Sequence, residues 1–163
     1  MTSADAFRER LLPSAGVHLL SVLAGGAGAL AGSYWGGWAA VTVGVVAAVL
    51  VSAGLSLTAP VVSVVPTGDP ADGAPADAPR LSAGDAVIPL DALGAAEEVD
   101  AEGIRRLLGP EADARAYVCH RSWVRSAVRF EVTDERDATP YWLVCTRRPA
   151  QLIAATGRRE AGA

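Results

Sequence analysis

The sequence predicts an α-helical membrane hairpin followed by a small α+β domain, and two observations carry this prediction. Residues 11–68 of the 163-residue chain contain no Asp, Glu, Lys or Arg, as expected for membrane-spanning segments. After this apolar stretch, short runs rich in β-branched and aromatic residues alternate with turn residues and end in one helical pattern. We therefore expect two transmembrane helices, then a curved antiparallel β domain capped by a C-terminal helix.

The apolar stretch divides into two segments that are long enough to cross a bilayer. Residues 17–35 and 38–57 each approach the ~20 residues that a helix needs to span hydrocarbon. Gly36-Gly37 lies between them and is flanked by Tyr34, Trp35 and Trp38, which is typical of a turn with an aromatic belt at the membrane interface. The sequence therefore predicts a two-span hairpin over residues 15–58.

A secretory signal peptide is the alternative interpretation of the first apolar segment, with Ala29-Leu30-Ala31 as its cleavage site. A second long apolar segment begins only seven residues after that site. Cleavage would leave this second segment without its helical partner, and we therefore favour an intact hairpin.

Both predicted spans carry small residues at every fourth position. This spacing places each set on one helix face, where small side chains allow membrane helices to approach closely. The sets are Ala24, Gly28, Gly32 and Gly36 in the first span, and Ala40, Gly44, Ala48, Ser52 and Ser56 in the second. A short turn makes the two helices antiparallel neighbours, so packing within the hairpin is the favoured role and homo-oligomerisation is the alternative.

The charges that flank the hairpin predict its orientation. Arg8 and Arg10 precede the first span, Arg80 is the first basic residue after the second, and the turn carries no Lys or Arg. Because basic residues are retained on the cytoplasmic side, both termini are expected in the cytoplasm of a multi-pass cell-membrane protein. Residues 1–14 then form a cytoplasmic N-terminal segment.

Residues 59–157 are predicted to form the cytoplasmic β-rich domain. Asp100 is the expected N-cap of one helix, and Pro149 the expected first residue of another. The predicted strands are 60–66, 80–82, 86–89, 95–99, 114–123, 126–133 and 141–146, with a turn at 83–85, and the predicted helices are 100–108 and 149–156. Strand runs closed by one C-terminal helix favour a pleckstrin-homology-like barrel.

Two segments of this region are predicted to stay outside the packed core. Residues 67–79 are rich in Ala, Asp, Gly and Pro and contain no aromatic residue, so we interpret them as a flexible excursion. Residues 158–163 are expected to form a disordered tail.

The charge of the domain is unevenly distributed. Residues 69–113 contain 11 acidic residues and 3 Arg, whereas residues 114–163 contain 5 acidic residues and 9 Arg. The two parts therefore carry net charges of −8 and +4, and the chain as a whole carries −4. We interpret the complete use of Arg in place of Lys as codon bias.

One cluster of basic and aromatic residues is the predicted binding site. Arg121, Trp123 and Arg125 alternate and would share one face of a strand. The full cluster is Arg121, Trp123, Arg125, Arg129, Tyr141, Trp142, Arg147 and Arg148. Three interpretations stay open: internal pairing with the acidic half of the domain, binding of an anionic headgroup or phosphate, and binding of a protein partner.

Catalysis and metal binding are not expected. The chain has two cysteines, Cys119 and Cys145, and two histidines, His18 and His120, which is too few for a zinc pattern. Both cysteines are expected to be buried in strands. Neighbouring residues of a strand point to opposite faces, so Cys119 and His120 are not expected to form a thiolate–imidazolium pair. No cofactor and no nucleic-acid partner are predicted.

Several sequence motifs carry a resemblance to a known family. They are Arg8-Glu9-Arg10-Leu11-Leu12-Pro13-Ser14, Leu108-Gly109-Pro110-Glu111-Ala112-Asp113, Trp123-Val124-Arg125, Thr139-Pro140-Tyr141-Trp142-Leu143-Val144 and Thr146-Arg147-Arg148-Pro149. With these motifs the chain resembles the actinobacterial membrane-protein family known as domain of unknown function 3093. The resemblance implies two spans, a small cytoplasmic domain and an actinobacterial host, and it brings no catalytic residues. The chain departs from the family pattern at the inserted residues 67–79, at Ser122 and at Cys145.

The function predicted from the sequence is that of a non-catalytic, membrane-anchored binding or scaffold module. Its cytoplasmic domain would recognise an anionic headgroup or a protein partner. The alternative is a small membrane-bound enzyme that acts on a phosphate-bearing or lipid substrate.

Overall fold

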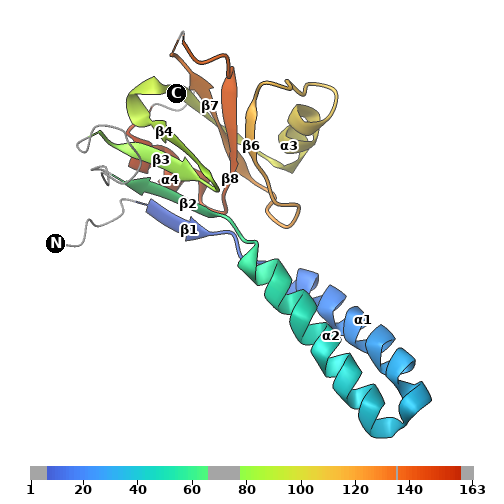
Figure 1. Ribbon diagram of the computed structural model, residues 1–163. Coiled ribbons are helices and arrows are strands. Elements are labelled where there is room, and N and C mark those ends of the chain that lie inside the picture. Colours follow the sequence, from blue (N-terminus) through green and yellow to red (C-terminus); the bar gives the residue numbers. More distant parts are fainter. Residues whose placement is uncertain (1–6, 66–77, 135, 159–163) are drawn as a thin grey trace, which may run out of the picture. The chain divides into compact units, whose positions relative to one another are not determined.

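The computed structural model describes residues 7–65, 78–134 and 136–158, and the chain divides into two compact units (Figure 1). One unit contains residues 12–59, and the other contains residues 7–11 together with the described residues from 60 onward. The segment before the hairpin therefore belongs to the domain that follows it. The predicted excursion over 67–79 lies outside the described residues except for 78 and 79, and so does the predicted tail except for residue 158.

The hairpin unit consists of two long helices joined by a short 3₁₀ turn. Its elements are α1 (Ala15–Gly32), η1 (Ser33–Trp35) and α2 (Gly37–Leu57). Among the described residues, Gly16–Trp35 and Gly37–Leu57 are the helical stretches long and apolar enough to cross a membrane. The chain reverses at Gly36, whose φ of +111° is a backbone conformation that glycine adopts without strain. The predicted turn is thereby confirmed at Gly36, whereas Gly37 is already the first residue of α2.

The backbones of α1 and α2 approach each other closely at glycines. A Cβ atom at Gly28 would lie 3.1 Å from the carbonyl oxygen of Val43, and one at Gly44 would lie 2.8 Å from that of Gly25. At Gly32 a Cβ atom would lie only 2.7 Å from the carbonyl oxygen of Ala39. Three of the predicted small residues therefore lie where the helices touch, and Gly25 is a contact residue that the spacing of four did not include.

The other predicted small residues occupy different places along this seam. Ala48 meets the Gly25 position, Ala40 meets the Gly32 position, and Ala24 is half-buried on α1. The Ser52 hydroxyl lies 3.1 Å from Nδ1 of His18, which links the two helices through a hydrogen bond. Ser56 instead donates to the Ser52 carbonyl within α2, and Gly36 faces open space. The small-residue faces are thus used within one chain, which favours intrachain packing over homo-oligomerisation.

The first sheet of the domain is antiparallel, with the order β1-β2-β3-β4. Its strands are β1 (Phe7–Arg10), β2 (Val61–Val65), β3 (Arg80–Ala83) and β4 (Ala86–Pro89). The predicted β3–β4 hairpin is confirmed, and Gly84 supplies the positive φ of +64° that its two-residue turn requires. Strand β1 was not predicted, because three of its four residues are charged.

The second sheet is mixed, with the order β5-β7-β8-β6. Its strands are β5 (Leu93–Val99), β7 (Ala127–Val132), β8 (Tyr141–Cys145) and β6 (Tyr117–Cys119). Strand β6 pairs with β8 in parallel, so the expectation of a wholly antiparallel domain is wrong at this pair. The reason is the strand order: β8 lies between β6 and β7, so the chain crosses over β8 on its way from the end of β6 at Cys119 to the start of β7. The predicted strand over 114–123 is correspondingly reduced to three residues.

Both sheets contribute to one hydrophobic core, and a C-terminal helix closes it. Val62 and Leu81 from the first sheet and Phe130 and Leu143 from the second are all fully buried in this core. Helix α4 (Pro149–Thr156) contacts β1 and β2 of one sheet and β5 and β7 of the other. The predicted capping helix, with Pro149 in its first turn, is therefore confirmed.

Helix α3 (Ala101–Leu108) follows β5 and begins with the predicted cap. The Asp100 carboxylate accepts a hydrogen bond of 2.7 Å from the backbone N–H of Gly103. Replacing Asp100 by Ala removes this acceptor and is expected to lower the free energy of unfolding of the domain by about 1 kcal/mol. Urea unfolding of the detergent-solubilised chain measures this loss. Asp91→Ala, at an exposed carboxylate outside α3, is the control, and an equal loss in both variants would contradict the cap.

Candidate functional site

The domain carries several surface cavities, and three of them differ clearly in charge. We call them the β5 cavity, the β4 cavity and the α3 cavity, with volumes of about 510, 460 and 560 Å³. Helix α3 (Ala101–Leu108) contributes residues to both the β5 cavity and the α3 cavity, whereas the β4 cavity has no lining residue from it.

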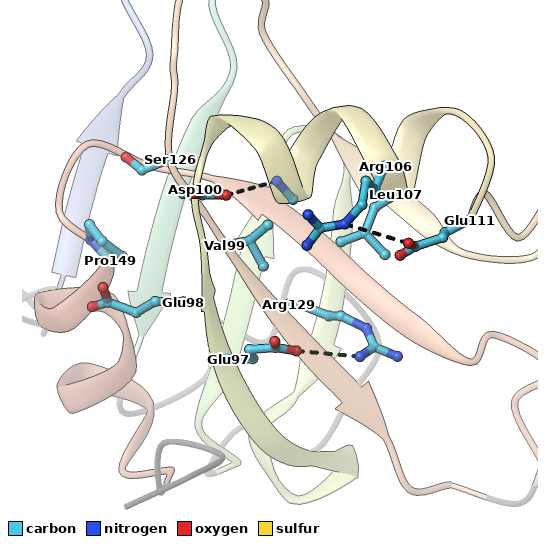
Figure 2. Close-up of a pocket in the computed structure, with 11 residues that line it drawn as sticks. Glu97, Glu98, Val99, Asp100, Arg106, Leu107, Glu111, Ser126, Arg129 and Pro149 are labelled. Carbon is cyan, nitrogen blue, oxygen red and sulfur yellow. Dashed lines mark hydrogen bonds and ion pairs between the residues drawn. The ribbon is translucent and has the colours of Figure 1, made fainter.

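The β5 cavity is polar, and each of its two Arg residues is paired with a carboxylate (Figure 2). Nη1 of Arg129 lies 3.4 Å from a Glu97 carboxylate oxygen, and Nε of Arg106 lies 3.5 Å from one of Glu111. The same Arg129 guanidinium lies 4.7 Å from the centre of the Tyr141 ring, an arrangement that permits a cation–π contact. Arg129 and Tyr141, two residues of the predicted cluster, are thus engaged with each other and with the acidic half of the domain.

The β4 cavity is acidic. Asp91, Asp134 and Asp137 line it together with Trp142 and Thr133, and no basic residue contributes to its lining. The three carboxylates do not converge, since no group of metal-ligating side chains able to hold an ion occurs among the described residues. This cavity therefore does not match an anionic ligand.

The α3 cavity is basic and has an apolar floor. Its polar lining consists of Arg105 from α3 and of His120, Ser122 and Arg125 from the connection between β6 and β7. Its apolar lining consists of Ala101, Ile104, Leu108 and Val124. No carboxylate belongs to the lining. Nη1 of Arg105 lies 2.6 Å from a carboxylate oxygen of Glu102, which does not belong to the lining, and both side chains are exposed.

The imidazole of His120 is the titratable group of this cavity with a perturbed pKa. Burial lowers the pKa of His120, and the positive charge of Arg121 lowers it further. Both effects disfavour the imidazolium form, so the ring is neutral at pH 7 and carries one N–H donor and one acceptor nitrogen.

The connection between β6 and β7 explains why part of the predicted cluster is displaced. Residues 120–126 contain a turn at 122–123 and belong to no strand, so the prediction that Arg121, Trp123 and Arg125 share a strand face is wrong. The turn closes with a hydrogen bond of 2.9 Å from the Val124 N–H to the Arg121 carbonyl. Nε1 of Trp123 donates to the Leu11 carbonyl at 3.0 Å, which holds the ring against the segment after β1.

The remaining residues of the cluster lie in separate places. Trp142 is buried in β8, with its ring centre 4.2 Å from that of Tyr117, and it lines the β4 cavity. The Arg148 guanidinium lies 4.9 Å from the Phe7 ring and donates to the Arg8 carbonyl at 2.9 Å. The exposed Arg147 contributes its backbone N–H to a contact with β1. Of the eight predicted residues, Arg125 is the one that lines the basic cavity.

A family comparison covers the hairpin and the domain together. The model of the family described as protein of unknown function DUF3093 matches residues 6–156. The chain belongs to the DUF3093 family. The resemblance found in the sequence is thereby confirmed, and the match extends from the residue before β1 to the end of α4. No match was found among curated proteins or among solved structures.

A buried carboxylate in this DUF3093 domain was missed by the sequence analysis. Glu9 in β1 is 8% exposed, and its Oε2 accepts a hydrogen bond of 2.5 Å from the Thr146 hydroxyl. The backbone N–H of Arg147 also donates to this carboxylate, at 3.2 and 3.3 Å to its two oxygens. The sequence signal that could have predicted this burial was the alternation of Phe7, Glu9 and Leu11, because every second residue of a strand lies on one face and all three are buried.

The cysteines of the DUF3093 chain are buried in β6 and β8, as predicted, and both are free thiols. Burial is the main cause that raises the pKa of Cys119 and of Cys145. Both therefore remain protonated at neutral pH and are poor nucleophiles. His120 follows the end of β6 and lines the α3 cavity, whereas Cys119 does not.

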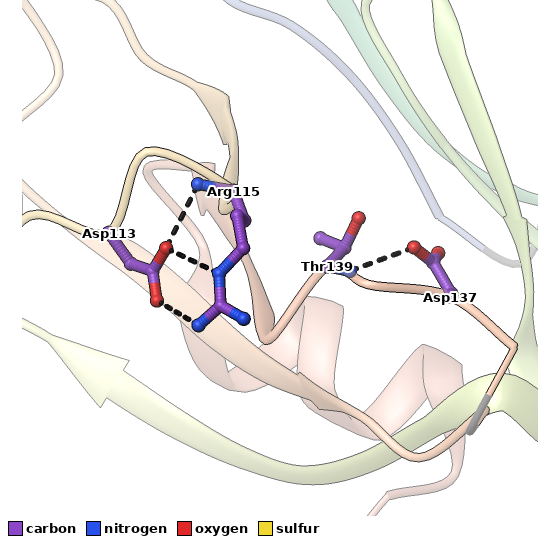
Figure 3. Close-up of polar contacts among 4 residues, drawn as sticks. All are labelled: Asp113, Arg115, Asp137 and Thr139. Atoms are coloured by element: carbon purple, nitrogen blue, oxygen red, sulfur yellow. Dashed lines mark hydrogen bonds and ion pairs between the residues drawn. The ribbon is translucent and has the colours of Figure 1, made fainter.

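The most strongly lowered acid pKa of the described residues belongs to a local turn (Figure 3). Asp113 accepts hydrogen bonds from the side chain and the backbone of Arg115, which lower its pKa to about 2. Asp137 accepts in the same way from Thr139, and its pKa is lowered as well. Asp137 is exposed and Asp113 is half-buried, and the hydrogen bonds that lower their pKa values come from their own loops. They stabilise turns and are not candidates for acid–base chemistry.

Proposed function

We propose that this DUF3093 chain is an integral membrane protein whose hairpin anchors a non-catalytic binding module. The hairpin helices expose large apolar side chains on several faces, including Leu30 at 77% and Leu50 at 66% exposure. A helix that is apolar all round is stable where lipid or protein covers it. With lengths of 20 and 21 residues, both helices match the thickness of a bilayer.

The observation that carries the topology is the pairing of β1 with β2. These strands flank the hairpin in sequence, and they pair in antiparallel register up to Arg10 and Val61. Just beyond, the Leu11 N–H donates to the Pro60 carbonyl at 3.0 Å. Two strands form such a ladder only when they lie on the same side of a membrane. The hairpin therefore enters and leaves the bilayer from one side, and the basic Arg8 and Arg10 favour the cytoplasmic side.

The binding role is supported by the arrangement of the domain. Two sheets around one core with a capping helix are compatible with a pleckstrin-homology-like architecture, although the parallel β6–β8 pair departs from an antiparallel barrel. The basic α3 cavity favours an anionic ligand, in agreement with the headgroup interpretation of the sequence. A protein partner is the second interpretation, which a pull-down from native membranes would test.

Cysteine labelling in intact cells tests the topology. In a background with Ala in place of Cys119 and Cys145, we expect strong labelling of Gly37→Cys by an impermeant reagent and none of Arg136→Cys. The Cβ positions of Gly36 and Gly37 are both unobstructed, and Gly37 is preferred because Gly36 has a positive φ, which a Cys side chain would strain. Arg136 lies on an exposed loop of the domain.

Permeabilised cells provide the control, since both sites should then react. Labelling of Arg136→Cys but not of Gly37→Cys in intact cells would reverse the proposed orientation. Recovery of the chain in the soluble fraction without detergent would contradict membrane insertion itself.

A further inference from the structure

We propose that the α3 cavity binds a phosphate monoester, held by Arg105 and Arg125 and hydrogen-bonded by His120 and Ser122. This inference rests on the proposed binding function and names the ligand class and the site. Of these four residues, only Arg125 belonged to the cluster predicted from the sequence.

The polar side chains of the cavity are complementary to a phosphate group. Two guanidinium groups supply positive charge and forked N–H donors, and these groups are well suited to phosphate oxygens. A hydroxyl from Ser122 and the ring N–H of His120 add neutral donors. Since Arg105 comes from α3 and the other three come from the β6–β7 connection, the site exists only in the folded domain.

The charge of the lining selects an anion. The lining contains two Arg and no carboxylate, whereas four acidic residues line the β5 cavity and three line the β4 cavity. Glu102 pairs with Arg105 outside the lining, where the two side chains are 61% and 65% exposed. An exposed pair of this kind contributes little stability, so a bound dianion would compete with it at small cost.

The apolar part of the lining indicates an ester and not only the free anion. Ile104 and Val124 are buried at 4% and 3% exposure and form the floor, while Leu108 is 40% exposed at the side. The cavity volume of about 560 Å³ is larger than a phosphate group needs. We infer that a compact apolar portion of the ligand packs on this floor.

His120 provides a direct readout of occupancy. Arg105 and Arg125 line the cavity with His120, Arg105 is paired with Glu102, and Arg121 is the charge that acts on the imidazole. Burial and Arg121 lower the pKa of His120 in the free protein. A phosphate dianion beside the ring would stabilise the imidazolium, and so the pKa of His120 is expected to rise on binding.

The experiment uses the full chain in phosphatidylcholine nanodiscs and follows the histidine rings by NMR. The chain has only two histidines, so His120→Gln assigns the signals. Addition of inorganic phosphate is expected to raise the pKa of His120 in a saturable manner. Arg105→Gln and Arg125→Gln should each weaken the apparent affinity roughly tenfold or more, because each removes charge-assisted hydrogen bonds.

Arg136→Gln is the matched control, since it removes the same charge from an exposed loop that does not line the cavity. Its affinity should equal that of the parent chain. Arg125→Lys retains the charge and should bind with intermediate affinity, and far-UV circular dichroism verifies that every variant is folded. An unchanged His120 pKa at saturating phosphate, or equal affinities in all the Arg variants, would overturn the proposal.

A second arm identifies the source of the phosphate. Nanodiscs that contain phosphatidic acid present the same monoester as a headgroup. A raised His120 pKa in these discs without added phosphate assigns the site to a lipid, whereas a response only to dissolved phosphate assigns it to a soluble ester. Failure of membrane insertion is detected separately by the labelling experiment, and the phosphate titration can still be performed in that case.

Discussion

Replacing Gly44 by Leu is expected to separate the two hairpin helices and to destabilise the hairpin by at least about 2–3 kcal/mol. Gly44 is the buried residue of α2, and a Cβ there would lie 2.8 Å from the Gly25 carbonyl oxygen and 3.1 Å from Ala29 Cβ. The first of these contacts is with helix backbone, which cannot move aside as a flexible side chain does. Thermal unfolding of the detergent-solubilised chain, followed by far-UV circular dichroism, measures the loss.

Gly54→Leu is the control for this prediction, because it adds the same side chain to the same helix. A Cβ at Gly54 meets nothing within 4 Å, so the added Leu faces the lipid or detergent. We expect the stability of Gly54→Leu to stay within about 0.5 kcal/mol of the parent chain. Equal losses in the two variants would show that the α1–α2 seam is not at Gly44.

Replacing Glu9 by Leu is expected to lower the free energy of unfolding of the domain by about 3 kcal/mol. The substitution removes the acceptor of the Thr146 hydroxyl and of the Arg147 N–H, and each donor then loses its partner in a buried or half-buried place. Loss of these bonds also releases β1, the edge strand that leads into α1. Urea unfolding of the full chain measures the difference.

Two further variants separate the hydrogen bonds from the change in polarity. Glu9→Gln keeps one carbonyl acceptor and should lose only about 1 kcal/mol. Glu98→Leu makes the same Glu-to-Leu change at an exposed residue of β5, and it should have little effect on the free energy of unfolding. If Glu9→Leu is as stable as the parent chain, the contact between β1 and the end of β8 does not hold the strand in place.

Elements with a clear local sequence signal were predicted from the sequence, whereas strand β1, which depends on a distant partner, was not. Asp100 marks the start of α3, and Pro149 that of α4, because capping and backbone restriction act within one turn. Strand β1 depends instead on β2, which lies on the far side of the hairpin in sequence. Three of its four residues are charged, which hides the alternation of Phe7, Glu9 and Leu11, and the burial of Glu9 requires donors supplied by Thr146 and Arg147.

The candidate site was predicted only in part for the same reason. Arg125 was singled out because it alternates with Arg121 and Trp123, but a turn replaces the strand on which that argument depended. Arg105 lies on α3, and no spacing rule relates it to His120 or Arg125. A cavity arises from the packing of such separate elements, and so its composition is known only once the fold is known.

The position of the hairpin between β1 and β2 has a consequence for biosynthesis. The ribosome produces β1 first, but its partner strand emerges only after both apolar helices have been made. The first sheet therefore cannot close until both helices of the hairpin have been made. For the same reason a C-terminal fragment that starts at residue 80 would lack both β1 and β2, including the core residues Val62 and Val64. A soluble form of the domain should instead join Leu11 to Pro60 by a short turn, because the hydrogen bond between these residues already brings the two ends together.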